Sequence, residues 1–113
     1  MALMLAAALV LSGSLIGLTS AQIKRTGTAS RQAVTSRTTF EKGYVKGYRD
    51  GNGIGKNDFN RKINADFRDY DQYREADIGY ISSAGRIEDY RDGYRLGFEM
   101  GYVDGYYGRP YSA

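Results

Sequence analysis

Two stretches of this chain, GYVKGYRDGNGIG at residues 43–55 and GYRLGFEMGYVDGY at residues 93–106, place a glycine at every fourth position. An aromatic residue follows most of these glycines. Because four residues make about one turn of an α-helix, each stretch predicts a helix with a stripe of bare backbone beside a stripe of aromatic rings. We call the two series the glycine ladders. The glycines that we expect to pack helix against helix are Gly43, Gly47, Gly51 and Gly55 in the first ladder and Gly93, Gly97, Gly101 and Gly105 in the second.

The ladder glycines are expected to be in contact because glycine is costly inside a helix. Each one costs about 1 kcal/mol relative to alanine, and a small domain has a total stability of only about 5–10 kcal/mol. Close approach of two helix backbones would offset that cost, as it does for small residues in membrane helices. Charged residues between the glycines, among them Lys46, Asp50 and Arg95, place this contact in water instead. Since four residues exceed one turn, the stripe drifts around the helix, and we expect right-handed contacts that are steep and short.

Aromatic residues are expected to supply most of the core. The chain contains 11 tyrosines and 4 phenylalanines but no tryptophan and no cysteine. Tyrosine suits a shallow core, because its ring can be buried while its hydroxyl reaches water or a charged neighbour. Tyrosines left exposed beside arginines would offer an interaction surface instead. The residues expected in one of these two roles are Tyr44, Tyr48, Tyr73, Tyr80, Tyr90, Tyr94, Phe98 and Tyr102.

The fold is expected to be all-α, a small bundle or hairpin of two long ladder helices and a shorter middle helix, after a signal peptide and a flexible linker. Residues 70–84 place Tyr70, Tyr73 and Tyr80 on one helical face and are the middle helix of this prediction. Residues 1–21 are mainly apolar and end in small residues, which is typical of a secretory signal peptide. Residues 22–37 contain four basic and no acidic residues and are interpreted as a flexible basic linker. The helical domain then spans residues 38–109, and residues 110–113 form a tail. Thr38 and Glu41 have capping-box spacing, so the first helix is expected to begin there and to end near Gly51 or Gly55.

The residue types argue against an enzyme. The absence of histidine and cysteine removes the usual general bases, thiol nucleophiles and zinc ligands. Residues 50–55, DGNGIG, resemble the start of a calcium-binding loop, but Ile54 and Arg61 stand where oxygen ligands are required. Lysine and arginine form no stripe on the expected folded part, which disfavours a nucleic-acid partner. We therefore expect no catalytic residue, no metal and no cofactor.

The order of three motifs resembles an uncharacterised family of small exported proteins from environmental Gram-negative bacteria. Its pattern is GYxxGxxxG, then YRxADxGY, then YRxGFxxGYxxGY, and the corresponding residues here are 43–51, 73–80 and 90–106. The resemblance covers residues 40–108, and its most specific part is the YRxADxGY block. It implies export and a helical domain, and it brings no activity, cofactor or catalytic residue.

Within the YRxADxGY block, Arg74 and Asp77 are the candidates for a polar structural pair, with two ordinary surface charges as the alternative. The sequence as a whole predicts a non-enzymatic structural or protein-interaction protein of the bacterial envelope, periplasmic or extracellular, that contacts a protein partner or itself. No stable membrane span is expected once the signal peptide is cleaved. The alternative function is a binding module for a polysaccharide or another envelope polymer through exposed Tyr and Arg side chains.

Overall fold

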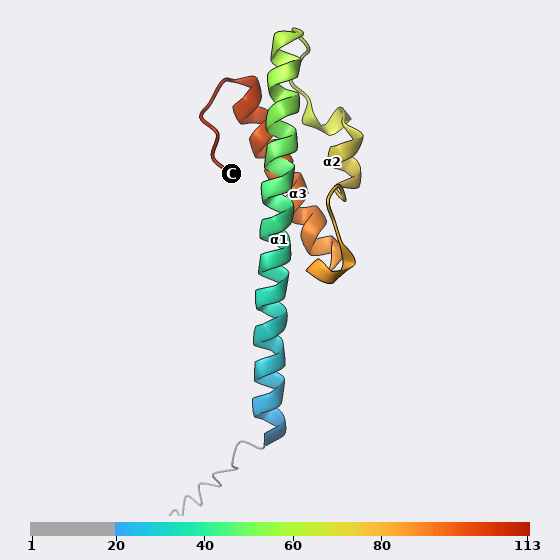
Figure 1. The fold of residues 1–113 in the computed structure, drawn as a ribbon, viewed down its shortest axis with the longest axis vertical. Coiled ribbons are helices and arrows are strands. Elements are labelled where there is room, and N and C mark those ends of the chain that lie inside the picture. The colour runs from blue at the N-terminus through green and yellow to red at the C-terminus, as the bar shows by residue number, and fades with distance from the viewer. Residues whose placement is uncertain (1–19) are drawn as a thin grey trace, which may run out of the picture.

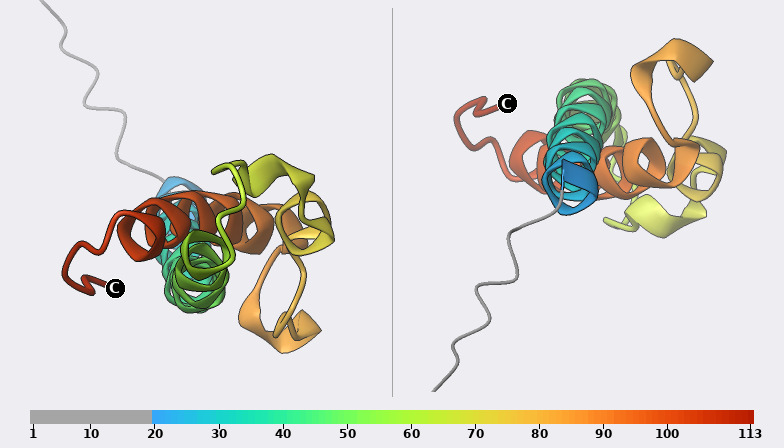
Figure 2. Two further views of the ribbon diagram at one scale, coloured as in Figure 1. Left: turned by 90° about the horizontal axis from the view of Figure 1, so that it is seen from above. Right: turned by 90° about the horizontal axis from the view of Figure 1, so that it is seen from below.

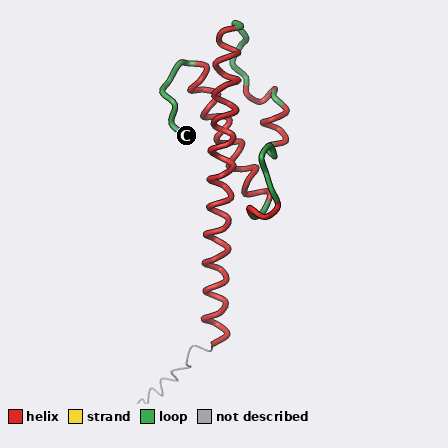
Figure 3. Tube along the Cα trace, viewed as in Figure 1, coloured by secondary structure: helices red, strands yellow, loops and turns green. Residues whose placement is uncertain are grey.

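The structure, a computed structural model, describes the backbone of residues 20–113 and the side chains of residues 27–113. Two long helices, α1 (Ser20–Asn60) and α3 (Ile87–Tyr106), pack against each other. A middle segment joins them and contains η1 (Phe67–Asp69), the short helix α2 (Asp71–Glu75) and η2 (Ser82–Ala84). The described part of the chain consists of helices and loops without a strand (Figure 1, Figure 3), which confirms the all-α prediction.

The glycine ladders form the contact between α1 and α3. A Cβ atom built on Gly47 would lie 2.0 Å from the backbone oxygen of Tyr94, and one built on Gly97 would lie 2.0 Å from that of Tyr44. Every glycine of both ladders faces a carbonyl oxygen of the opposite helix in this way, at 2.0–2.2 Å from the position of the missing Cβ. Because real Cβ contacts are never this short, the two backbones touch only where both helices lack side chains.

The two helices run in the same direction. Gly43 faces Tyr90, and Gly55, three turns further along, faces Tyr102, so the residue numbers rise together. Figure 1 shows α3 crossing behind α1 from lower right to upper left while both run upward, which is a right-handed crossing. The expected handedness is therefore confirmed. The expectation of a short helix contact is wrong, because all four glycines of each ladder touch the opposite helix. Both stripes have the same four-residue period, so they drift together and the helices follow each other.

The parallel arrangement places different parts of the chain on the two faces of the helix pair. The middle segment returns the chain from the end of α1 to the start of α3 along one face, and the C-terminal tail lies on the opposite side (Figure 2). Under the middle segment, Tyr90 and the rings that follow the four α3 glycines stack with centroids 6.0–6.5 Å apart. This row is buried and consists of Tyr90, Tyr94, Phe98 and Tyr102, continued by the partly buried Tyr106.

The first helix begins much earlier than expected. Residues 22–37, interpreted as a flexible linker, belong to α1, and Glu41 forms an ion pair with Arg37 at 2.9 Å instead of capping a helix start. No proline interrupts residues 20–60, so the helical hydrogen bonding of the packed part continues in both directions and ends only at Asn60. Of the signal peptide expected over residues 1–21, only Ser20 and Ala21 lie within the described residues, and they are part of α1.

The middle helix is shorter than expected. A helical face was predicted over residues 70–84, but α2 ends at Glu75 because Ala76 takes a left-handed conformation with φ 52°. Gly79 also has a positive φ, 81°, and turns the chain toward α3. Gly85 has φ 134° and lies against Thr39, so glycine is required there both for its conformation and for the close approach. These turns let the segment follow the groove beside α3 instead of forming a third full helix.

We predict that adding a single methyl group to a ladder destabilises the protein, although alanine favours helix. Gly97→Ala should lower the free energy of unfolding by about 1–3 kcal/mol because the helices must separate around Tyr44. Gly53→Ala, on the same pair of helices but with no atom within 4 Å of its Cβ position, should raise it by about 0.5–1 kcal/mol. Urea denaturation followed by circular dichroism measures both changes. Equal effects of the two substitutions would contradict the backbone contact.

Candidate functional site

On the face covered by the middle segment, tyrosines of α3 donate hydrogen bonds to carboxylates of α1. The Tyr94 hydroxyl donates to Asp50 at 2.6 Å, and the Tyr102 hydroxyl donates to Asp58 at 2.7 Å. Both pairs have a sequence separation of 44 residues. The same separation pairs Phe98, which has no hydroxyl, with Ile54, which has no carboxylate and packs against the core. Along this face, the polarity of each α1 side chain therefore matches that of the ring opposite.

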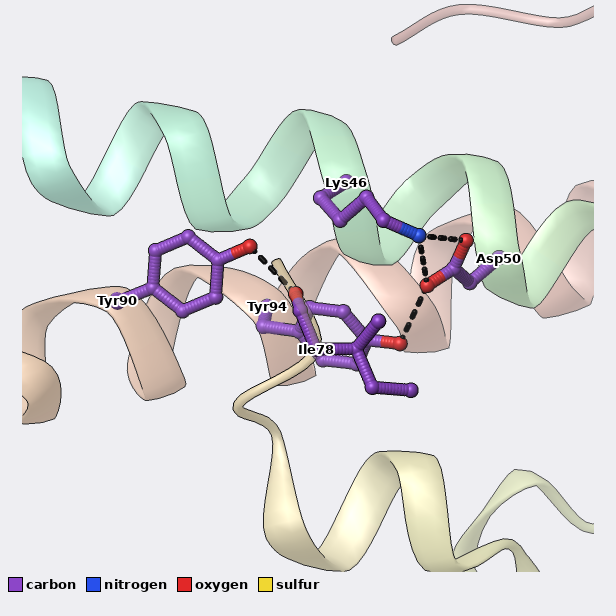
Figure 4. Close-up of polar contacts among 5 residues, drawn as sticks. All are labelled: Lys46, Asp50, Ile78, Tyr90 and Tyr94. Atoms are coloured by element: carbon purple, nitrogen blue, oxygen red, sulfur yellow. Dashed lines mark hydrogen bonds and ion pairs between the residues drawn. The ribbon is translucent and has the colours of Figure 1, made fainter. Parts of the chain in front are cut away.

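Asp50 also forms an ion pair with Lys46 of the same helix, as Figure 4 shows. The Lys46 ammonium group lies 2.5 Å from one Asp50 oxygen and 2.6 Å from the other. One turn earlier on α3, the Tyr90 hydroxyl donates to the backbone oxygen of Ile78 at 2.6 Å. These bonds join α1, α3 and the middle segment, so they position all three parts relative to one another.

Asp58 is the most deeply buried carboxylate of this face. Its side chain is 1% exposed and accepts hydrogen bonds from the hydroxyls of both Tyr70 and Tyr102. Burial, followed by the hydrogen bond to Asp58, raises the pKa of Tyr70 to about 12. Burial and the same carboxylate raise the pKa of Tyr102, and burial together with Asp50 raises that of Tyr94. The phenols thus remain neutral donors over the whole physiological range of pH.

The YRxADxGY block anchors the middle segment through its backbone. Arg95 donates to the carbonyl oxygens of Tyr73 at 3.3 Å and Arg74 at 2.8 Å, and Arg91 donates to that of Glu75 at 3.2 Å. These carbonyls lie at the end of α2, where helix carbonyl groups lack partners of their own. The block is therefore held by two arginines of α3.

The polar pair expected between Arg74 and Asp77 is not formed. Arg74 instead forms an ion pair with Asp71 and donates to the carbonyl oxygen of Arg68, and both Arg74 and Asp77 are exposed. The reason is the left-handed turn at Ala76, which ends α2 and removes the helical spacing on which the predicted pair depends. The two tyrosines of the block, Tyr73 and Tyr80, pack against the core, which is one of the two roles expected for them.

The opposite face of the helix pair is only half closed. The C-terminal tail covers its upper part, where Tyr48 donates to Asp104 at 2.7 Å and the Tyr111 ring meets Tyr48 edge-on with centroids 4.9 Å apart. The separation of 56 residues that pairs Tyr48 with Asp104 also places Tyr44 opposite Met100 and Phe40 opposite Leu96. Below the tail, two partly buried rings of α1 therefore lie beside two side chains of α3 that are about half exposed. We call this surface the open face, and its residues are Phe40, Tyr44, Leu96 (45% exposed) and Met100 (44% exposed).

Few other features of the described residues indicate chemistry. No group of three acidic side chains there could hold a metal ion, and every buried side-chain nitrogen and oxygen atom has a hydrogen-bond partner. Residues 50–55 are part of α1, so the calcium-loop geometry is absent. A surface hollow of about 670 Å³ lies between α1 and the start of α3, lined by Arg31, Arg86 and Asp89 among others. No helix in the described part is both long and apolar enough to cross a membrane.

In the tyrosine–carboxylate hydrogen bonds between α1 and α3, the sequence analysis identified the tyrosines but not the carboxylates. The rings of Tyr48, Tyr90, Tyr94, Phe98 and Tyr102 are buried, as one of the two predicted roles requires, and Tyr44 is partly buried. The carboxylates that accept hydrogen bonds from three of these rings were not predicted: Asp50 from Tyr94, Asp58 from Tyr102 and Asp104 from Tyr48. A signal for them exists, since each carboxylate lies three residues after a ladder glycine, but its meaning depends on which helix lies opposite.

Comparison of the chain with protein-family models, with curated proteins and with solved structures finds no match. The functional argument therefore depends on the contacts and surfaces described above.

We predict that the Asp58 cluster contributes strongly to stability. Tyr102→Phe removes one of the two hydroxyls that Asp58 accepts from and should lower the free energy of unfolding by about 1–3 kcal/mol. Tyr107→Phe is the matched control, because the Tyr107 ring is 62% exposed, and it should change stability by less than about 0.5 kcal/mol. Urea denaturation of the two variants measures the difference. A loss as small for Tyr102→Phe as for the control would show that the hydrogen bond is not a source of stability.

We also predict that stability falls at alkaline pH. Tyrosine in an unfolded chain ionises near pH 10, whereas the pKa of Tyr70 in the folded protein is about 12 and those of Tyr94 and Tyr102 are also raised. The unfolded state therefore releases protons first, and the stabilisation present below about pH 10 is lost as the pH rises through the folded values. Tyrosinate absorbance and circular dichroism should change together above about pH 10. Ionisation of all tyrosines near pH 10 with an unchanged helical spectrum would contradict this coupling.

Proposed function

We propose that this chain is a non-enzymatic protein of the bacterial envelope that acts by binding another polypeptide, either a different protein or a second copy of itself. The single observation that supports this proposal most directly is the difference between the two faces of its helix pair. The described part of the chain covers one face with its own aromatic segment and leaves the corresponding part of the other face open.

The two faces are related by the register of the ladders. On the covered face, the row of rings on α3 lies beside Lys46, Asp50 and Asp58 of α1, and the hydroxyl of Tyr94 has a carboxylate partner. On the open face, the ring of Tyr44 on α1 lies in the corresponding row, but α3 presents Leu96 and Met100 in place of charged residues. At these corresponding positions the open face is therefore more apolar than the covered face, although none of the described segments covers it.

Exposed apolar surface of this kind favours a protein partner. Aromatic residues and methionine are enriched where proteins bind one another, and apolar side chains grouped on one surface gain free energy when they are covered. The covered face shows which chemistry fits such a groove, because a polypeptide segment that presents Phe67, Tyr70 and Tyr73 fills it. A partner segment with aromatic and aliphatic side chains would fit the open face in the same way.

Export is part of the proposal, and its support is the apolar stretch at residues 1–18 followed by small residues. The chain has no histidine or cysteine, and its carboxylates Asp50, Asp58 and Asp104 accept structural hydrogen bonds, so these residues support a binding role better than a catalytic one. A binding role is consistent with both observations.

We predict a position-specific crosslink from the open face. A benzophenone amino acid in place of Met100, in cells that produce the full chain, should crosslink to a polypeptide, and an adduct of twice the chain's mass would identify a second copy. The matched control places the same group at Gly53, which is exposed with no atom within 4 Å of its Cβ position. Adding Leu96→Glu to the Met100 variant should abolish the adduct, because it buries a charge in the apolar contact. Equal crosslinking at both positions, or none at position 100, would disprove the proposal.

A further inference from the structure

A second exposed surface lies where α1 and α3 end. We call it the tip and define it by Phe59, Ile63, Tyr106 and Tyr107. The Phe59 and Tyr106 rings meet edge-on with centroids 5.7 Å apart, those of Tyr106 and Tyr107 at 5.1 Å, and the Tyr106 hydroxyl donates to the backbone oxygen of Ile63 at 2.8 Å. Phe59 is 58% exposed, Ile63 37% and Tyr107 62%. The tip is thus an apolar surface that is fixed in place and still accessible to solvent.

Exposed cations surround the tip, and acidic side chains are few there. Lys56, Arg61, Lys62 and Arg109 are all exposed. Residues 56–65 and 105–113 contain a single acidic side chain, that of Asp58, which is buried and accepts hydrogen bonds from two tyrosines. Arg109 alone has a carboxylate nearby, Asp104 at 3.9 Å. The tip is therefore more positive than residues 38–55 and 66–104, where acidic and basic residues are mixed.

Helix stabilisation explains only part of this arrangement. Because α1 and α3 are parallel, both negative helix ends lie here, and nearby cations stabilise them. That effect accounts only for cations that directly follow a helix end, such as Arg61, because neither helix has a basic residue in its last turn. It gives no reason to leave Phe59 and Ile63 in water. The tip also forms the end of the molecule farthest from the start of α1 (Figure 1), so a flat partner could reach it without touching the open face.

We propose that the tip docks the protein onto the surface of a bilayer that contains anionic lipids, a role that goes beyond the protein contact proposed above. Phe59, Ile63 and Tyr107 enter the interface, where aromatic side chains are favoured, and the surrounding cations bind lipid phosphates. A polysaccharide fits less well, because the aliphatic side chain of Ile63 has no polar atom to pair with sugar hydroxyls. The apolar side chains of the tip would enter the apolar edge of the lipid layer, and the cations around them would contact the phosphate groups above it.

The chain has no tryptophan, so one introduced tryptophan reports on its own position. In the full chain, Phe59→Trp emission should shift to the blue and be quenched by brominated lipid on vesicles of phosphatidylglycerol and phosphatidylcholine. The control is Val45→Trp, which replaces an apolar residue that is 43% exposed on the outer side of α1. It should show neither effect, even if the apolar N-terminal residues bring the chain to the vesicles. A shift of both tryptophans, or of neither, would overturn the proposal.

The cations give a second readout. In the Phe59→Trp chain, Lys56→Gln with Arg61→Gln should weaken binding to the anionic vesicles about 30-fold, since each cation near such a surface contributes about a fivefold change in affinity. Lys42→Gln with Arg49→Gln, two exposed residues away from the tip, should leave binding unchanged. Equal binding to pure phosphatidylcholine vesicles would contradict the proposal. A blue shift with alginate but not with vesicles would assign the tip to a polysaccharide instead.

Discussion

The contact between the bare backbones of α1 and α3 is the constraint on which the rest of this structure depends. Each ladder glycine leaves space for a carbonyl oxygen of the other helix, at 2.0–2.2 Å from where a Cβ would stand. Such a contact tolerates no sliding, because a shift by one residue would drive a side chain into the opposite backbone. The ladders therefore determine both the distance between α1 and α3 and their register. The register in turn determines which side chains meet on the two faces of the helix pair.

The core follows from that register. Residues after the glycines of α3 form one row of stacked rings, and residues three positions after the glycines of α1 lie against it. With so few aliphatic residues, the chain buries tyrosines and provides their hydroxyls with carboxylates or carbonyl oxygens. Such bonds are stronger when the acceptor is charged and water is excluded. Asp50 and Asp58 thus have a structural role as acceptors for the buried tyrosines.

Parallel helices leave the molecule asymmetric, and the asymmetry separates its surfaces. The connection between α1 and α3 must return along the pair, so it closes one face and leaves the other to the short tail, which reaches only as far as Tyr48. Both helices also end at the same place, which gathers the rings of Phe59 and Tyr106 with the cations of the tip. The open face and the tip are the two surfaces to which we assign partners, a polypeptide and a lipid surface respectively.

From the sequence alone, the period of the ladders determined that the fold is helical, that Gly47 and Gly97 lie in a helix contact, and that tyrosines such as Tyr94 form the core. These properties depend only on the spacing of residues along one helix, which can be read from the sequence of that helix alone. The direction of α3, the length of α1 and the acceptors Asp50 and Asp58 came only from the tertiary structure. A stripe of glycine looks the same to a parallel and an antiparallel partner, and two groups 44 residues apart meet only once the register is known. The pair expected at Arg74 and Asp77 failed for the same reason, because the groove beside α3 ends α2 at Ala76, whereas local spacing predicted that the helix would continue.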